Sequence, residues 1–298
     1  MIIFPAALFS QDIDPAQYRQ NPLLLNPAYA GSWKALRLAS DLRGDFIRQK
    51  NDPDTRDNNL SAAFSADIYF DKIKSGFGVN YYSNEMALNT ASVTGTRTGL
   101  DYAFHLPLCK DSSGNAKMWL QAGVEYAHQV LNYHFDFKYA QDYNDLSAGI
   151  LLFSKNFYLG FSARHINEPH NNILVSTRVP FGCTADMGFK IKLSERLPDF
   201  FIQEHGLLVY DGISTNVFAG VDINYNKVYV GAAYGTFYEA AVYSVGFRLH
   251  AVQSGYSYER GFYGNSRLYM PGSHELYVRF HIFQKKTKLL LNNSGFIY

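Results

Sequence analysis

The chain has 298 residues, of which 47% are hydrophobic and 18% are charged, and 27 Lys and Arg against 26 Asp and Glu leave a formal net charge of +1. No apolar run reaches the roughly 18 residues that a bilayer-spanning helix needs, which excludes a helical membrane protein. The near-zero net charge argues against a nucleic-acid partner, and the hydrophobic content argues against disorder.

Aromatic residues are unusually frequent. Tyr and Phe each occur 23 times, and aromatic residues make up 16% of the chain. Many Tyr, Phe and Gly residues with few charges are typical of long strands that face lipid on one side and water on the other. A mean hydropathy of -0.19 agrees with this, because such strands alternate apolar and polar residues.

The first 34 residues precede the expected strands. Residues 1–10 are apolar and end in a small residue, so we interpret them as a probable signal-peptide remnant; the alternative is a short apolar plug or strand. Residues 11–34 are interrupted by Pro15, Pro22 and Pro27, which allows only short helical or extended pieces. We expect a periplasmic or plug segment that enters a lumen or caps its mouth, rather than a flexible extension. Its candidate contact residues are Leu24, Asn26, Pro27, Tyr29 and Trp33.

From residue 35 onward the sequence alternates with period two, as half-buried strands do. In residues 241–250 one face carries Ala, Tyr, Val, Phe and Leu, while the other carries Val, Ser, Gly, Arg and His. We predict an all-β fold, a transmembrane outer-membrane β-barrel of about 14 antiparallel strands over residues 35–284, followed by a C-terminal tail, 285–298. The strands are expected near 35–47, 58–70, 75–85, 91–106, 116–128, 145–154, 157–165, 182–193, 200–210, 213–224, 227–236, 240–250, 252–260 and 273–284.

The connections between these strands alternate in length. The expected loops 48–57, 86–90, 129–144, 166–181 and 261–272 are mostly long. The others are mostly short, as at 71–74, 154–156, 225–226 and 251, with 109–116 and 194–199 as longer members. Outer-membrane barrels have long outer loops and short periplasmic turns, so this pattern predicts periplasmic termini.

A soluble β-sandwich would also alternate. However, the polar faces carry small residues and single Arg, Asp or His residues rather than the many charges of a solvated surface. Bulky residues on those faces, Tyr158, Phe218 and Tyr277, favour a filled lumen over an open one. Arginines on the polar faces, such as Arg97 and Arg279, are better explained by structural ion pairs with Asp41, Asp101, Asp222 or Glu125 than by a selective pore.

Motifs for catalysis and metal binding are missing from the sequence. There is no H-E-x-x-H and no G-x-S-x-G. Ser162 and His165 are an odd number of positions apart, which puts them on opposite strand faces. Cys109 and Cys183 lack metal-site spacing, and we do not favour a disulfide between them. We therefore expect no enzyme activity, no cofactor and no metal.

Several phrases resemble one known family in the expected order. Residues 20–32, QNPLLLNPAYAGS, resemble the N-terminal signature of the PorP/SprF family of Bacteroidota. Residues 64–71 with 75–79 resemble its second hairpin, residues 145–162 with 165–169 its central hairpin, and residues 254–258 with 272–276 its last two strands. The resemblance spans nearly the whole chain.

This resemblance implies a 14-stranded outer-membrane β-barrel, and the strand count given above follows this expectation. It also implies a non-enzymatic component of type IX secretion. Implied partners are a secreted, adhesin-like surface protein with a type IX C-terminal domain, components of the secretion or gliding motor, and outer-membrane lipid. The aromatic loop sequence at 131–139 suits protein contact. We therefore expect partner binding by Tyr133, Phe135, Phe137, Tyr139 and His170. The alternative function is a porin or a transporter of small or hydrophobic molecules.

Overall fold

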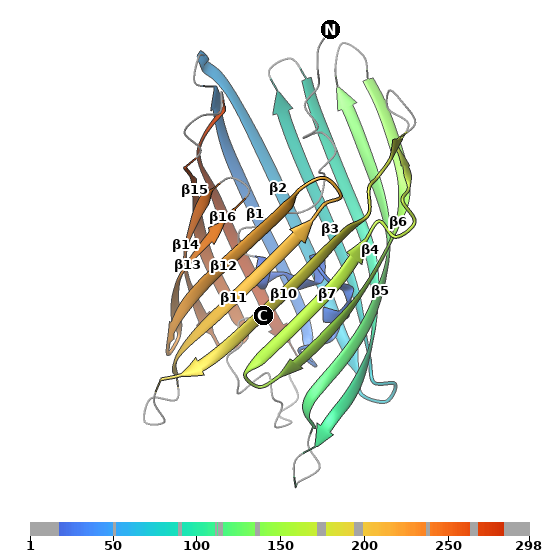
Figure 1. Cartoon of the computed structure of the whole chain (residues 1–298), viewed down its shortest axis with the longest axis vertical. Helices are drawn as coiled ribbons and strands as arrows, with labels where there is room; N and C mark the ends of the chain where they lie inside the picture. The colour runs from blue at the N-terminus through green and yellow to red at the C-terminus, as the bar shows by residue number, and fades with distance from the viewer. Residues whose placement is uncertain are drawn as a thin grey trace.

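The computed structural model describes residues 18–49, 52–88, 91–110, 112, 116–134, 138–171, 177–193, 199–236, 239–262 and 268–282. Fourteen of its strands close into one antiparallel barrel in the order β1-β16-β15-β14-β13-β12-β11-β10-β7-β6-β5-β4-β3-β2 (Figure 1). The barrel closes where Leu36 at the start of β1 pairs with Ile282 at the end of β16. The prediction of a 14-stranded antiparallel barrel is therefore confirmed.

The strands of the wall have the following bounds: β1 Leu36–Gln49, β2 Asp52–Phe70, β3 Ser75–Leu88, β4 Ala91–Lys110, β5 Ala116–His134, β6 Lys138–Ser154, β7 Phe157–Arg164, β10 Gly182–Lys192, β11 Phe200–Tyr210, β12 Thr215–Tyr225, β13 Val228–Gly235, β14 Ala240–Leu249, β15 Val252–Gly261 and β16 Leu268–Ile282. Two further short strands, β8 His170–Asn171 and β9 Thr177–Arg178, form a separate two-stranded sheet between β7 and β10 that the sequence did not predict.

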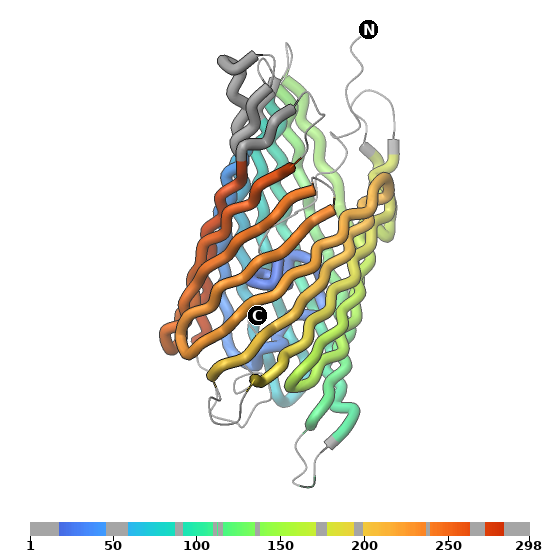
Figure 2. The backbone as a smooth tube through the Cα atoms, turned by 60° about the vertical axis from the view of Figure 1, so that its left-hand side comes forward, coloured from blue at the N-terminus to red at the C-terminus, as the bar shows by residue number. Residues whose placement is uncertain are grey.

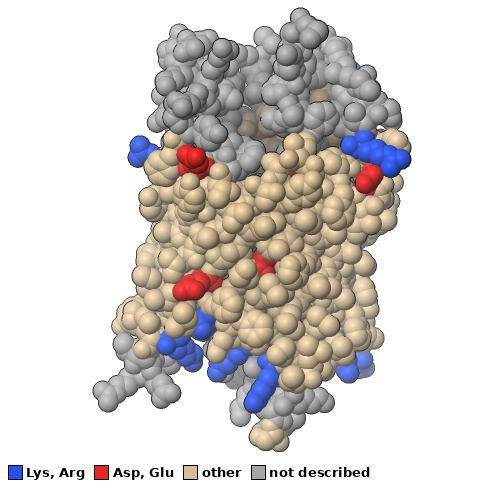
Figure 3. All heavy atoms as spheres, in the orientation of Figure 1, with Lys and Arg blue, Asp and Glu red and all other residues tan. Residues whose placement is uncertain are grey.

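The side chains alternate between lumen and outer surface, as the period-two pattern predicted. Along β5, for example, Gln121 and Glu125 are buried while Val124 and Tyr126 are exposed. The outward residues form an apolar belt, and Figure 3 shows charged side chains mainly above and below it on the face in view. Such a belt flanked by polar margins fits the hydrocarbon layer of a membrane.

No helix in the described part of the chain has the length and hydropathy needed to cross a membrane.

The predicted long loops are largely wrong, because the strands continue through them. β5 extends to His134 and β6 begins at Lys138, so most of the expected loop 129–144 is a hairpin in which Tyr133 pairs with Tyr139. Similarly, β2 begins at Asp52 and β16 at Leu268. Polar sequence was interpreted as loop, yet a strand that rises above the membrane needs no lipid-facing side and keeps its backbone hydrogen bonds.

The wall is taller on one side than on the other. Strands β2, β4 and β5 have 19, 20 and 19 residues, whereas β7 and β13 have eight each. We call the end of the barrel where β1 begins and β16 ends the lower end, and the opposite end the upper end, as they are drawn in Figure 1.

Candidate functional site

A broken helical segment, residues 18–33, lies inside the barrel, and we call it the plug. It contains the 3-10 helices η2 Tyr18–Gln20, η3 Pro22–Leu24 and η4 Pro27–Tyr29. Pro22 and Pro27 begin η3 and η4, where a missing N–H costs nothing, and the Asn26 side chain accepts a hydrogen bond from the Ala28 N–H as an N-cap. The sequence left open whether this segment enters the lumen or caps its mouth, and Figure 2 shows it within the wall.

The first strands hold the plug through side-chain carboxylates and a hydroxyl. Asn21 donates from Nδ2 to Asp41 on β1 over 2.8 Å, and its Oδ1 accepts from Ser65 on β2. The backbone N–H of Gly31 donates to Asp67 over 2.8 Å, and Asp67 also pairs with Arg37.

The central strands hold η4 and its flanks. Asn26 Nδ2 donates to the carbonyls of Ile150 on β6, over 3.1 Å, and Phe161 on β7, over 3.2 Å. Ser162 donates to the Leu25 carbonyl over 2.7 Å. The Tyr29 hydroxyl donates to Asp186 on β10. The Asn26 amide thus hydrogen-bonds two backbone carbonyl groups of the wall from inside the lumen.

The remaining side of the wall binds the start of the plug. The Tyr18 hydroxyl is hydrogen-bonded to His205 Nδ1 on β11, and Arg19 forms an ion pair with Asp222 on β12. Gln20 contacts Gln253 on β15, and its carbonyl accepts from Arg279 on β16. Together with His105 on β4, which contacts the Ala30 carbonyl, these bonds reach β1, β2, β4, β6, β7, β10, β11, β12, β15 and β16.

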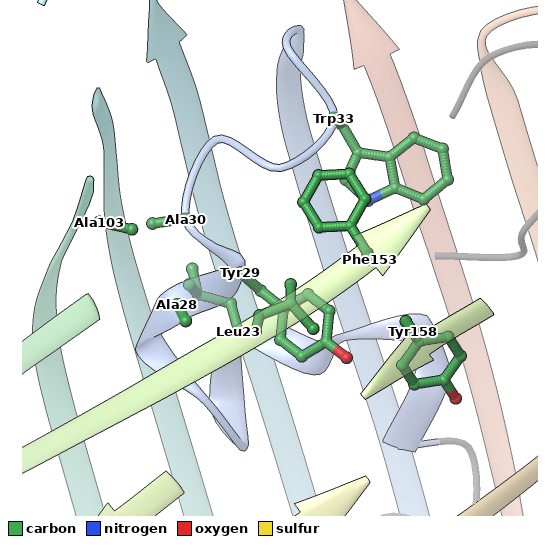
Figure 4. Close-up of a cluster of buried hydrophobic side chains, with 9 residues drawn as sticks. Leu23, Ala28, Tyr29, Ala30, Trp33, Ala103, Phe153 and Tyr158 are labelled. Atoms are coloured by element: carbon green, nitrogen blue, oxygen red, sulfur yellow. The ribbon is translucent and has the colours of Figure 1, made fainter. Parts of the chain in front are cut away.

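Apolar packing reinforces the polar contacts. Leu23, Tyr29 and Trp33 of the plug form a buried cluster with Phe153 and Tyr158 of the wall, together with Ala28, Ala30, Ala103 and Leu151 (Figure 4). Leu24 packs separately against Ala63 and Tyr82. All five predicted plug residues, Leu24, Asn26, Pro27, Tyr29 and Trp33, are buried. So are the three bulky residues expected in the lumen, Tyr158, Phe218 and Tyr277.

Lys34 lies between the end of the plug and the start of β1 and contacts two aromatic rings of the wall. Its ammonium lies 3.7 Å from the Trp119 ring centroid and 5.0 Å from that of Tyr69, both within cation–π range. Burial lowers the pKa of Lys34 to about 8, and Asp71 opposes this shift.

Ion pairs line the lumen, as the sequence predicted, but the partners differ in part. Arg97 forms a two-pronged pair with Glu125 and also reaches Asp145 over 3.3 Å. In contrast, Asp41 and Asp222 bind the plug rather than a wall arginine. Asp67, Asp186 and His205 were not singled out from sequence. Their positions on polar faces were visible there, but their partner, the plug, was not.

Ser162 and His165 need a correction. β7 ends at Arg164 and His165 has a φ of 54°. The backbone turn therefore breaks the period-two count, and both residues are buried rather than on opposite faces. They still do not form a pair, because Ser162 bonds Leu25 and Thr184 while His165 lies 3.0 Å from Asp145.

Three of the residues expected to bind a partner, Tyr133, Tyr139 and His170, lie at the upper end. Tyr133 is only 2% exposed and packs with Val93, Leu131 and Tyr143, and with the partly buried Tyr139 and Val179. His170 is exposed in β8, and its carbonyl accepts from Gln141 over 2.9 Å. Phe135 and Phe137 lie outside the described residues, as do residues 1–10 and the tail, 285–298.

Cys109 and Cys183 are free thiols. Within the described ranges, His, Cys, Asp and Glu side chains form no group of three that would hold a metal ion.

Comparison with known proteins identifies the family. The model of the family described as "Type IX secretion system membrane protein PorP/SprF" matches residues 7–280. The chain belongs to the PorP/SprF family. No curated protein matches it. PorP/SprF membership and the barrel together assign the chain to the outer membrane as part of type IX secretion.

Solved structures resemble this PorP/SprF chain in fold alone. The toluene transporter TodX of Pseudomonas putida is 10% identical, with a TM-score of 0.51 over 87% of this chain and 92% of TodX. The toluene transporter TbuX of Ralstonia pickettii is 8% identical, with a TM-score of 0.55 over 91% of this chain and 94% of TbuX. Both are outer-membrane-type barrels, which supports the architecture described above.

Proposed function

We propose that this PorP/SprF protein is a non-enzymatic docking barrel, which holds a secreted, adhesin-like surface protein at its upper end and contacts the secretion or gliding machinery at its lower end. The observation that carries this proposal is the plug. Hydrogen bonds and ion pairs tie residues 18–33 to strands around the circumference of the wall, from Asp41 on β1 to Arg279 on β16. A lumen filled in this way suits a scaffold better than an open pore.

The upper end supplies the docking surface. The β5–β6 hairpin rises beside the segment between β7 and β10, and the Gln141 side chain and Val179 join the two. Tyr139 is partly buried, and His170 is exposed. Aromatic residues backed by a packed cluster are common at protein interfaces. The proposed occupant is the type IX C-terminal domain of the secreted protein.

The lower end is proposed to face the periplasm. The wall begins and ends there, at Leu36 and Ile282. Barrels with an even number of strands bring both wall termini to one side, and short turns are typical of the periplasmic side. On that side, residues 285–288, which lie outside the described part of the chain, are proposed to contact the motor components, while residues 18–33 close the lumen.

The test is a pull-down in detergent with the chain tagged at its lower end. Replacing residues 133–139 by a two-residue turn removes the tip of the hairpin and leaves the wall below it paired. We expect a folded barrel that no longer recovers the surface protein. A matched control shortens the upper connection between β13 and β14, residues 236–239, where the strands of the wall are short. This variant should retain the partner. Recovery of the surface protein with the first variant would reject the docking proposal.

The second candidate is transport of a small or hydrophobic molecule. The observation that favours it is the fold shared with the toluene transporters TodX and TbuX. A steady single-channel conductance of the intact protein in a planar bilayer, or uptake by liposomes that contain it, would favour this function over docking.

A further inference from the structure

Four neighbouring strands bring cationic and donor side chains together on the inner wall near the lower end. Arg248 on β14 is opposite Gln253 on β15, which is opposite Arg279 on β16. His281, two residues after Arg279, is opposite Arg37 on β1. Directly opposed residues and residues two apart share one face of a sheet, so these side chains are neighbours. We call Arg37, Arg248, Arg279 and His281 the basic cluster.

Several donors in and around this cluster have no acceptor in the described part of the chain. Arg37 and Arg279 are both 0% exposed. Arg37 Nη1 and Nη2, Arg279 Nε and His281 Nε2 make no hydrogen bond to any described residue. The side chain of the half-buried Arg248 forms no hydrogen bond or ion pair with those residues either. Buried donors without acceptors are costly, and more so when they are charged.

Trp33 of the plug completes the surroundings. The centroid of its ring lies 4.5 Å from the ring centroid of His281 and 5.0 Å from Cζ of Arg279. Its buried Nε1 also has no acceptor among the described residues. The indole therefore adds one more N–H donor beside the cluster.

Carboxylates near the cluster do not balance its charge. Asp67 bonds Arg37 Nε, and Asp41 is bound to Asn21 of the plug. Three guanidinium groups therefore face two carboxylates, both of which already have partners. Gln253 supplies only a neutral oxygen to Arg279.

We propose that the basic cluster and Trp33 bind a phosphate group. The planar fork of arginine matches the oxygens of a phosphate and bonds them in pairs. A phosphate group carries several acceptor oxygens and at least one negative charge, which suits several guanidinium donors around one position. The group comes from free phosphate or from a lipid headgroup. This inference goes beyond the docking function and does not depend on it.

The lower mouth offers an entrance for an anion. Lys190 is buried in the lumen, where three neighbouring cations, Lys155, Lys192 and Arg248, outnumber the nearby carboxylate of Asp199. Figure 3 shows basic side chains along the lower margin of the face in view. An excess of positive charge at a mouth raises the local concentration of anions.

The test measures binding of inorganic phosphate to the full chain, purified in phosphate-free non-ionic detergent, by titration calorimetry. The unfolding temperature is a second measure, since a ligand that binds only the folded state raises it. Sodium chloride at matched ionic strength controls for screening. We expect phosphate to bind and to raise the unfolding temperature, and chloride to do neither. Equal effects of the two salts would overturn the proposal.

The variant Arg248→Gln locates the site. The Arg248 side chain has no hydrogen bond or ion pair with a described residue to lose, so folding should be preserved, while phosphate binding should weaken about tenfold for the loss of one charged contact. The matched control is Arg178→Gln, an exposed arginine at the upper end that pairs with Glu168, and its phosphate affinity should stay unchanged. Equal affinity in Arg248→Gln and the wild type would overturn the site.

A competition separates the two sources of phosphate. Short-chain phosphatidylglycerol is added to protein saturated with inorganic phosphate. Displacement at a lipid concentration well below that of phosphate supports a headgroup at the cluster, and retention of inorganic phosphate supports the free ion.

Discussion

At the residue scale, the plug fits in the lumen because the wall has glycine at positions where its backbone approaches the backbone of the plug. A Cβ atom at Gly76 on β3 would lie 2.0 Å from the Ala30 carbonyl oxygen, and one at Gly123 on β5 would lie 2.4 Å from the Ala28 nitrogen. Backbone atoms cannot move aside as a flexible side chain can. These glycines therefore allow η4 and the residues after it to pack directly against the wall.

The variant Gly76→Ala should destabilise the protein by about 1–3 kcal/mol, the usual cost of overpacking, and loosen the plug. The control is Gly206→Ala, whose added Cβ has its nearest neighbour at 3.6 Å and should change stability by less than about 0.5 kcal/mol. Urea unfolding in detergent measures the first effect. Limited proteolysis of residues 18–33 measures the second. If Gly76→Ala resisted protease as well as the wild type does, the close packing of the plug against Gly76 would be refuted.

Lys34 gives a pH dependence. Burial places its folded-state pKa at about 8, below the unfolded value of about 10.4. Between these values the unfolded chain binds more protons, so stability rises with pH from about 8 to about 10. Exposure to solvent reduces the size of this gain. The urea midpoint of the wild type should therefore rise with pH relative to that of Lys34→Met, which lacks the titrating group. Parallel curves for the two proteins would contradict this assignment.

At the scale of elements, the sequence predicted the strands better than their ends. Period-two alternation, together with the 14-stranded barrel that the family resemblance implies, located the wall strands, and the prolines predicted a broken segment before them. Alternation says nothing about where lipid ends, so strands that continue into water, such as β5 to His134, were interpreted as loops. The plug contacts of Asp67, Asp186 and His205 could not be predicted, because the plug is far from these residues in sequence.

The element η4 offers a test of how the plug is anchored. Asn26→Asp keeps the shape and the acceptor for Ala28 but replaces the amide that donates to Ile150 and Phe161 by an oxygen facing two carbonyls. We expect a loss of about 1–3 kcal/mol in urea unfolding, as for a buried acceptor left without its donor. Asn167→Asp is the matched control, since its exposed amide donates to the Asn144 carbonyl, where water can substitute. Equal losses in both variants would argue against a special role for Asn26.

At the scale of the whole molecule, the wall and the plug have separable roles. Hydrogen-bonded pairs between neighbouring strands run around the full circle and close it between β1 and β16. The wall therefore satisfies its own backbone without residues 18–33, as a barrel in lipid must. The lumen carboxylates that bind the plug, such as Asp41 and Asp222, would be hydrated if it were removed.

Deleting residues 18–33 should therefore yield a barrel that still folds in detergent and shifts its gel migration on heating, but conducts ions. We expect a steady current in planar bilayers for the deletion and none for the wild type, because the plug occupies the lumen from β1 around to β16. A variant with Gly206→Ala, which leaves the plug in place, serves as the control and should stay closed. If the wild type carried the same current as the deletion, the plug would not seal the barrel, and the argument for a docking scaffold over a transporter would lose its main support.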